Sequence, residues 1–256
     1  MENSCRKKYK LSSKKWISAS RRTGFRRNSA LIPANADLYS YGVNNPVRYI
    51  DPDGNSTEVS LDEDGNYIVT GGCADEDRNI YIMKDGVRSG EVLGQSLTSY
   101  SFLDDYNNPV LGAKISLNDD SGEVFLTNFK TRRPMVLYYM FNGRNGKKYD
   151  FKDLGIDSYL SPVEKDKYRY RGMIITDNSG NKVFASARDI GNYAAGYIAG
   201  ICGFLPWKFA RAGFDCYNGS PEPPVTQRAQ WEGHEAGLRQ NNINCKQVQE
   251  RIQSHH

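Results

Sequence analysis

Short runs in which apolar and polar residues alternate follow one another from Asn55 to about Lys182. A period of two is typical of β-strands with one buried face. Turn pairs such as Asp64-Gly65 and Asp85-Gly86 separate the runs, and such pairs favour tight hairpins. We therefore predict a mostly antiparallel sheet, with strands in the runs STEVSL, NYIVT, NIYIM, AKISL, EVFLTNF, MVLYYMF, YRYRGMIIT and KVFAS.

The period of the pattern changes near Asp189. Apolar and small residues then recur three and four positions apart in DIGNYAAGYIAGICG and in LPWKFARAGFDCYNG, as on one face of a helix. After the break SPEPPV, Thr226 can cap a third helix, and NCKQVQERIQ is a candidate for a short fourth one. The sequence thus predicts an α+β fold, with a mostly antiparallel β-rich region in residues 55–185 packed against a cluster of three to four helices in residues 186–256.

Gly196 and Gly200 lie one helical turn apart in the first of these helices, beside Ala195 and Ala199. A glycine inside a helix costs about 1 kcal/mol relative to alanine, so two of them indicate a packing reason. We expect the backbone of another element to approach this face closely.

The charge is segregated along the chain, although the net charge is only +4. Residues 1–54 carry eleven Lys or Arg and four Asp or Glu, and the remainder has a net charge of −3. A protein that binds duplex nucleic acid nonspecifically needs concentrated positive charge, so the acidic remainder disfavours that function. The basic leader, residues 1–37, is expected to be poorly ordered.

The chain contains no run of about 18 apolar residues, and its best candidate, Ala194–Trp207, is short and rich in glycine. We therefore expect no stable membrane insertion. The basic first residues have no apolar stretch behind them, so they do not resemble a secretory signal peptide. The five cysteines form no C-x-x-C pair, and no zinc signature is present.

Asp189 and Asn192 are the first candidate site residues. Asp189 lies where the N-cap of the first predicted helix belongs, and that capping role alone can explain it. Alternatively, a carboxylate and an amide at a helix N-terminus can position an anionic or polarised substrate group.

Asp150 and Lys152 lie two positions apart, so on a strand they share a face. They can form a surface ion pair, or they can point together into a cleft. If Asp150 and Asp189 converge, one can act as a general base while Lys152 stabilises developing negative charge, as hydrolysis requires.

His234 is the only histidine outside the C-terminal pair, and it can supply a group that titrates near neutral pH. Glu232 lies two positions before it. On a helix that spacing is about 200 degrees, so the two side chains are expected to face opposite sides. A partly exposed histidine on an amphipathic helix remains the alternative.

Residues 38–54, LYSYGVNNPVRYIDPDG, resemble the closing motif of the Rhs repeat-associated core of bacterial polymorphic toxins. The resemblance rests on Asn44-Asn45-Pro46-Val47, on Tyr49 and on Asp51-Pro52-Asp53-Gly54. In that family the core encloses a variable C-terminal toxin. The resemblance therefore implies that residues 55–256 form the toxin domain.

The C-terminal half resembles the bacterial polymorphic toxin type 44 group. The matching stretches are KYDFK, RDIGNYAAGYIAG, PWKFARAGFDCY and TQRAQWEGHEAG. This resemblance implies a toxin of interbacterial competition that a specialised secretion system delivers into a target bacterium. It also implies a cognate immunity protein as partner.

Three functions follow as hypotheses. The first is a hydrolytic enzyme that cleaves RNA or DNA, without a cofactor if histidine and lysine carry the chemistry, or with magnesium if paired aspartates do. The second is a hydrolase of the cell envelope that acts on peptidoglycan or its lipid precursor. The third is a non-catalytic binding or pore-forming module.

Overall fold

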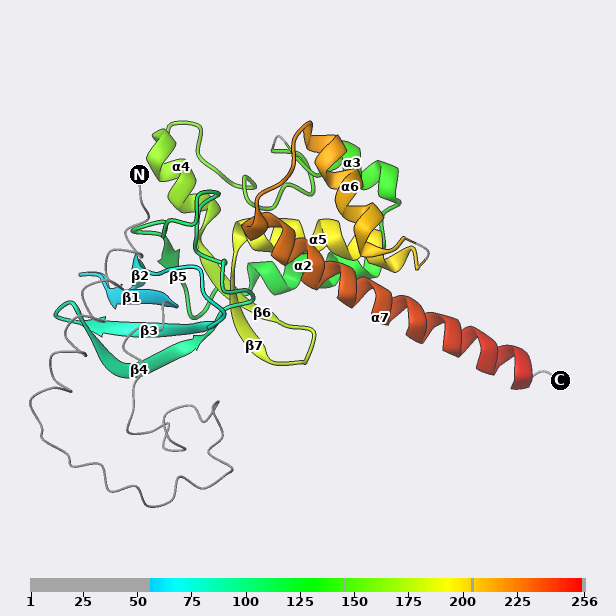
Figure 1. Cartoon of the computed structure of the whole chain (residues 1–256), viewed down its shortest axis with the longest axis horizontal. Helices are drawn as coiled ribbons and strands as arrows, with labels where there is room; N and C mark the ends of the chain where they lie inside the picture. The colour runs from blue at the N-terminus through cyan, green and yellow to red at the C-terminus, as the bar shows by residue number, and fades with distance from the viewer. Residues whose placement is uncertain (1–55, 145, 204, 255–256) are drawn as a thin grey trace, which may run out of the picture. The chain divides into compact units, whose positions relative to one another are not determined.

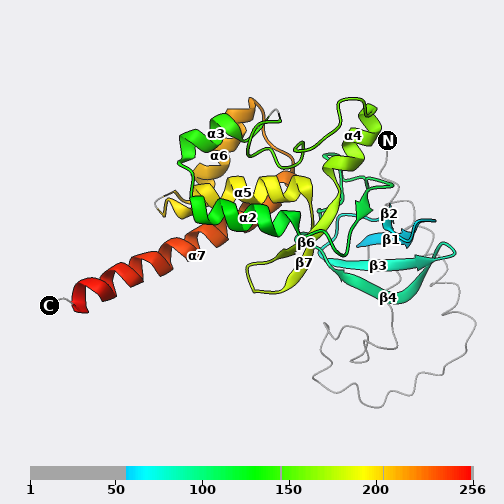
Figure 2. The ribbon, with the colours of Figure 1, turned by 180° about the vertical axis from the view of Figure 1, so that it is seen from behind.

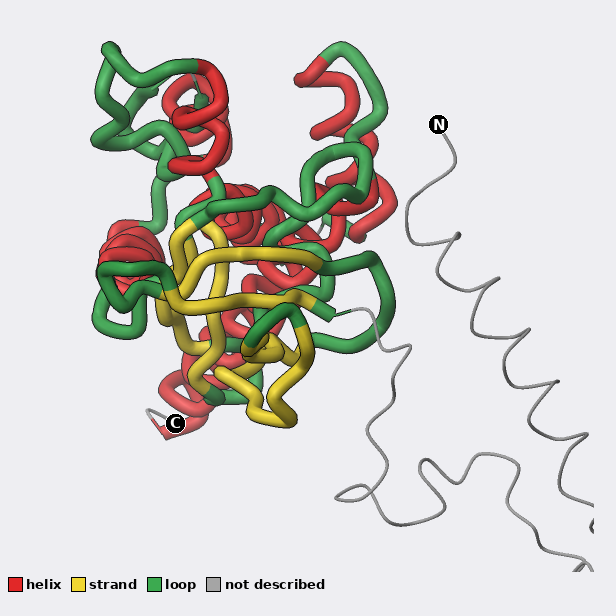
Figure 3. Tube along the Cα trace, turned by 90° about the vertical axis from the view of Figure 1, so that its left-hand side faces the viewer, coloured by secondary structure: helices red, strands yellow, loops and turns green. Residues whose placement is uncertain are grey.

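The computed structural model describes residues 56–144, 146–203 and 205–254. The leader and the closing motif predicted for residues 1–54 lie outside this part of the chain. The described residues form seven strands and six helices, so the α+β class is confirmed. Figure 3 shows the strands gathered on one side, with helices behind them.

The strands form one mixed sheet in the order β4-β3-β1-β2-β5-β6-β7. Four of the six pairings are antiparallel, and β1 with β3 and β5 with β6 are parallel, so the mostly antiparallel sheet is also confirmed. The strands are β1 (Thr57–Leu61), β2 (Tyr67–Gly71), β3 (Asn79–Lys84), β4 (Val87–Gln95), β5 (Lys114–Ile115), β6 (Gly172–Thr176) and β7 (Lys182–Ser186).

The sheet curls until its two outer strands meet. Ser96, the residue after β4, forms a parallel bridge with Phe184 of β7. The next amide, that of Leu97, donates to the Phe184 carbonyl at 2.7 Å. At this point the last strand therefore has a partner on both sides.

The predicted hairpin at Asp85-Gly86 joins β3 to β4. Both residues have positive φ, 53° and 74°, which is the conformation that a tight two-residue hairpin needs. Gly71-Gly72 instead lies at the end of β2, and the next strand, β3, pairs with β1 rather than with β2. The turn pairs in the sequence thus predict where the turns lie, whereas the pairing of the strands depends on the sheet as a whole.

Two runs that we predicted as strands are helices. The run EVFLTNF lies in α2 (Ser121–Arg132), and MVLYYMF lies mostly in α3 (Val136–Asn142). Leu126 and Phe129 are buried three positions apart on α2, a helical spacing that a short apolar run conceals. Figure 2 shows α2 lying beside α5.

The first two residues of YRYRGMIIT are also helical, because Tyr168 and Arg169 end α4 (Pro162–Arg169). Ser161 and Glu164 form a capping box at its start, in which each side chain accepts a hydrogen bond from the other residue's amide. Three helices therefore interrupt the region that we predicted as β-rich, all of them between β5 and β6.

The C-terminal region is helical, as predicted. It consists of α5 (Ala187–Ile201), α6 (Trp207–Asn218) and α7 (Pro224–Ser254). The run predicted as a fourth helix continues α7 without a break, and Thr226 is not its cap, because α7 begins two residues earlier. Figure 1 shows α7 crossing α5 and extending beyond it.

The small residues of α5 pack against α7, as the sequence predicts. A Cβ on Gly196 would lie 1.8 Å from the Gln230 carbonyl oxygen, and a Cβ on Gly200 would lie 2.1 Å from that of His234. Gly233 of α7 packs equally closely against α5, since a Cβ on Gly233 would lie 1.9 Å from the Tyr193 carbonyl oxygen. The two backbones are therefore in direct contact.

Candidate functional site

A cavity of about 360 Å³ lies beside α5, between that helix and α3 and α6. Aromatic and aliphatic side chains line one part of it, among them Tyr139, Phe209 and Phe214. Polar residues line the other part, including Asp150 and Asn192. The cavity thus combines an apolar chamber with a polar end.

A second cavity, of about 300 Å³, adjoins α4. Four residues line both cavities, namely Lys152, Arg188, Asn192 and Glu222. Because these side chains border both spaces, the cavities meet at them and form one cleft. We call these four residues, together with Asp150, the junction.

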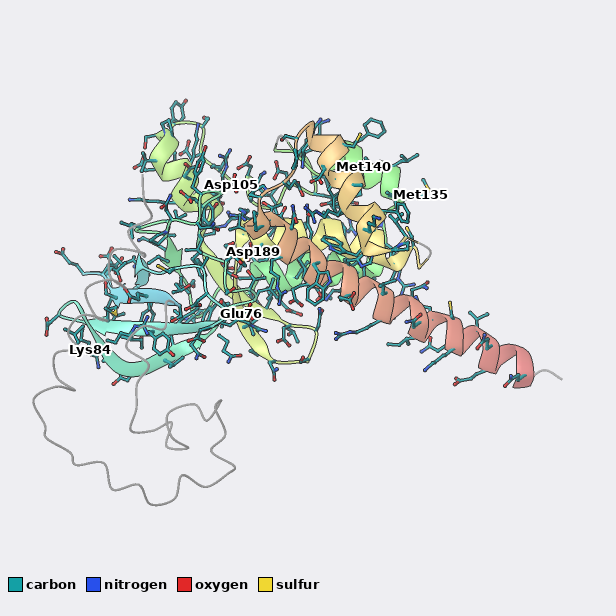
Figure 4. All side chains as sticks on the ribbon, viewed as in Figure 1. Glu76, Lys84, Asp105, Met135, Met140 and Asp189 are labelled. Carbon is teal, nitrogen blue, oxygen red and sulfur yellow. The ribbon has the colours of Figure 1, made fainter. Side chains whose placement is uncertain are left out.

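Arg188 is held in place by three segments. Its Nη1 donates to the Leu103 carbonyl at 2.8 Å and to the Tyr170 hydroxyl at 2.6 Å. Its Nη2 donates to Thr226 Oγ1 at 3.4 Å. Asp105, which Figure 4 labels on the α4 side, adds an ion pair at 3.8 Å. The guanidinium is buried, so it presents a fixed positive charge to the cleft.

Glu222 is the junction residue that the sequence analysis missed. It lies between Pro221 and Pro223, in a segment that we interpreted only as a break between helices. Its Oε1 accepts a hydrogen bond from Asn218, and its amide donates to Asp215 Oδ1 at 2.9 Å. Its Oε2 is buried without a hydrogen-bond partner of normal geometry among the described residues.

Burial raises the pKa of the Glu222 carboxyl above its usual value, and the charge of Asp215 acts in the same direction. The Gln230 amide, Lys152 and Arg188 act in the opposite direction. A carboxyl group whose pKa is moved toward neutrality is suited to donating or accepting a proton.

Asp150 and Lys152 do not lie on a strand, contrary to our expectation, but in a turn-rich loop between α3 and α4. Asp150 is buried, and its Oδ2 accepts from the Gly146 amide at 2.9 Å. Arg171 fixes the loop by donating to the carbonyls of Phe151 and Lys152, both at 3.0 Å. Both predicted side chains line the cleft.

Asp189 does not lie with them. It is not the N-cap of α5, because Ser186 occupies that position and accepts from the Asp189 amide at 3.2 Å. Arg188 and Asn192 are four positions apart and share the cleft face of the helix, whereas Asp189 lines neither cavity. The convergence of Asp150 and Asp189 is therefore not found.

The Asp189 side chain is fully buried where the sheet meets the helices (Figure 4). Thr98 Oγ1 donates to its Oδ2 at 3.3 Å. Burial raises the pKa of Asp189 to about 6, although Arg188 and the hydroxyls of Ser101, Thr98 and Ser186 oppose the shift. The Asp189 side chain thus links α5 to the segment that follows β4.

His234 and Glu232 also lie away from the cleft. His234 is buried, its Nε2 lies 2.8 Å from the Leu205 carbonyl oxygen, and its ring packs against Trp207 with centroids 5.6 Å apart. Glu232 contacts Asn178 and pairs with Arg228 at 3.6 Å. The two side chains thus point to different neighbours, as the helical angle predicts, and the histidine is a core residue.

No group of three or more His, Cys, Asp or Glu residues is placed to bind a metal in the part of the chain that the structure describes. A magnesium ion held largely by substrate phosphates needs fewer protein ligands, so the magnesium expectation stays a prediction. Among the described helices, none is both long enough and apolar enough to cross a bilayer.

Comparison of the sequence and the structure with known proteins finds no match. No family model matches the chain, no curated protein matches its sequence, and no solved structure matches its fold. Fold and cleft define the chain only as an α+β protein with a partly apolar cleft whose junction has two carboxylates, two cations and an amide.

Proposed function

We propose that residues 55–256 are a hydrolytic toxin module, and that the junction is its catalytic site. The observation that carries the proposal is that Glu222 and Asp150 line the same cleft as Lys152, Arg188 and Asn192. Hydrolysis needs groups that move protons and groups that stabilise negative charge, and the junction has both.

Each junction residue has a role in this proposal. Asp150 accepts a proton from the attacking water, and Glu222 donates its proton to the leaving oxygen, which suits its raised pKa. Lys152 and Arg188 stabilise the negative charge that develops on the substrate. Asn192 orients the substrate through hydrogen bonds from the same face of α5 as Arg188.

The apolar chamber favours a substrate that has both a polar, anionic part and an apolar part. A phosphate-bearing lipid precursor of the cell envelope combines these parts, with its phosphate at the two cations and its hydrocarbon beside Phe209 and Phe214. We therefore place the envelope precursor first among the substrate classes.

Nucleic acid remains the second candidate because of one observation. The Arg144 guanidinium lies 4.2 Å from the Tyr217 ring centroid, and both residues line the cavity. An aromatic ring beside a cation can stack a base and bind its phosphate.

Resemblance of residues 38–54 and of the C-terminal half to polymorphic toxins supports the toxin assignment. On this proposal the chain is delivered into a rival bacterium by a specialised secretion system. A cognate immunity protein neutralises it in the producing cell.

Expression of the full chain in bacteria tests the proposal, once in the cytoplasm and once with a periplasmic export signal. We expect growth arrest that Glu222→Gln and Lys152→Met abolish, while Glu250→Gln, at an exposed position of α7, does not. Altered pools of lipid-linked precursor with intact RNA and DNA support the envelope substrate. Degraded RNA or DNA supports the second candidate, and full toxicity of Glu222→Gln contradicts the site.

A further inference from the structure

The helix α3 is apolar on both of its sides. Val136, Tyr139 and Met140 point inward and line the cavity. Leu137 and Phe141, one turn apart, point outward and are 68% and 72% exposed. A helix that is apolar all round normally lies in a core or in contact with lipid. The outer side of α3 is apolar but exposed, so we expect a binding partner to cover it.

The exposed apolar side extends beyond α3. Met135, just before the helix, is 78% exposed, and Figure 4 shows it at the outer edge of the helical cluster. Tyr138 and, on α6, Phe209 are also exposed. Phe209 lines the apolar chamber as well, so this surface continues into the cleft. We call Met135, Leu137, Tyr138, Phe141 and Phe209 the α3 face.

Positive charge flanks α3 along the chain. Between Lys130 and Lys148 the chain has six Lys or Arg and no Asp or Glu, although residues 55–256 have a net negative charge. Lys147 Nζ donates to the Phe141 carbonyl at 3.1 Å, and Lys148 Nζ lies 5.8 Å from the Tyr138 ring centroid. Lys147 therefore lies at the C-terminal end of α3, and Lys148 lies beside the Tyr138 ring.

We propose that the α3 face docks on the surface of an anionic lipid bilayer. Apolar side chains enter the boundary of headgroups and acyl chains, while the lysine and arginine side chains reach back to the lipid phosphates. An aromatic residue with a polar tip, such as Tyr138, is typical of that boundary. The docked orientation turns the apolar chamber toward the bilayer, because Phe209 belongs to both.

A second copy of the chain fits this surface poorly. Two α3 faces in contact would bring two clusters of positive charge together, and like charges across an interface cost affinity. A bilayer that contains anionic lipid supplies the opposite charge and the apolar interior together. The inference concerns binding alone and does not depend on the hydrolytic activity.

Sedimentation of the full chain with lipid vesicles tests the proposal. We expect binding to vesicles of phosphatidylcholine mixed with phosphatidylglycerol, little binding to phosphatidylcholine alone, and weaker binding at high salt. Leu137→Asp with Phe141→Asp should reduce binding about tenfold or more, because two anchors are lost. Lys147→Glu with Lys148→Glu should reduce it at least roughly 25-fold, at about fivefold per basic residue.

Matched controls separate this surface from a general effect of charge. Leu61→Asp with Val87→Asp changes two exposed apolar residues of the sheet, where Figure 4 labels the nearby Lys84 far from α3. Lys182→Glu with Lys246→Glu changes the net charge as much as the lysine pair at α3 does. The basic leader is the same in every variant, so a difference between pairs reports on α3.

The proposal is overturned if the wild type does not bind anionic vesicles, or if the control pairs lose as much binding as the α3 pairs. A dimer that Leu137→Asp with Phe141→Asp converts to a monomer in light scattering would also overturn it, in favour of self-association. All substituted residues are exposed, so the thermal unfolding of each variant is expected to match that of the wild type and confirms that the comparison is between folded proteins.

Discussion

Gly196 of α5 lies so close to Gln230 of α7 that a side chain has no room between them. A Cβ at Gly196 would lie 1.8 Å from the Gln230 carbonyl oxygen, which is backbone and cannot rotate away. This contact joins the helix that carries Arg188 and Asn192 to the helix that carries Gln230, so the cleft depends on it.

We predict that Gly196→Ala destabilises the protein by about 3 kcal/mol or more, since the two helices must separate. Gly191→Ala, in the same helix, is the matched control, because a Cβ there meets nothing within 4 Å. It should stabilise the fold by up to about 1 kcal/mol. Chemical denaturation of both variants measures the difference, and similar effects would contradict the packing account.

Asp189 should make stability depend on pH. Its folded pKa of about 6 lies above the ordinary value of 3.8, so the folded state binds the proton more tightly than the unfolded state does. Stability from this residue is therefore present below pH 4 and is lost as the pH rises through 6. Two pKa units correspond to about 3 kcal/mol.

Comparison with Asp189→Asn isolates that contribution, because all other titrating groups are shared. We expect the wild type to gain up to about 3 kcal/mol relative to the variant between pH 7.5 and pH 4. The unfolding free energy of both proteins at several pH values is the measurement. A constant difference across this range would show that Asp189 ionises normally.

His234 should affect stability rather than catalysis. Its ring is buried between the Leu205 carbonyl and Trp207, and it lines neither cavity of the cleft. Replacement of His234 by Leu should cost about 1–3 kcal/mol, because the Leu205 carbonyl loses its partner. Activity per folded molecule should stay near that of the wild type, and a loss of 100-fold or more would return His234 to the list of catalytic candidates.

Glu222 should show the opposite behaviour. Burial disfavours its charged form, so Glu222→Gln should leave the melting temperature at pH 7.5 unchanged or raise it. Loss of the proton donor should reduce kcat about 100-fold or more. Activity and melting temperature are measured on the same preparation, and a fall in both would identify Glu222 as a structural residue.

Local patterns predicted those elements whose signal is local. The alternation of β1, β2, β3 and β7 and the positive φ of Asp85-Gly86 follow from a few neighbouring residues. The strand predictions for the runs in α2 and α3 were wrong because seven apolar-rich residues fit both the strand period of two and the helix period of 3.6. These runs become helices because their apolar residues pack against α5, and this tertiary contact cannot be inferred from the run itself.

The candidate site was predicted in part for the same reason. Asp150, Lys152 and Asn192 stood out as polar residues in predicted elements, and they line one cleft. Arg188 is adjacent to Asp189 in the same motif, but only the phase of α5 shows which of the two faces the cleft. The only sign of Glu222 in the sequence is a carboxylate between two prolines, which is weak evidence for a site. Its burial arises from tertiary packing alone.

The two walls of the cleft differ in how freely their residues can be exchanged. On α5 eleven of the fifteen residues are buried, and the α7 backbone packs against Gly196 and Gly200. On α3 and α6 only Tyr139 and Ala210 are buried. A library that randomises the exposed positions of α3 and α6 would therefore retain the folded scaffold and the junction, provided that Tyr139, Trp207, Ala210, Asp215 and Asn218 stay constant with α5 and α7. This makes the protein a starting point for retargeting by directed evolution.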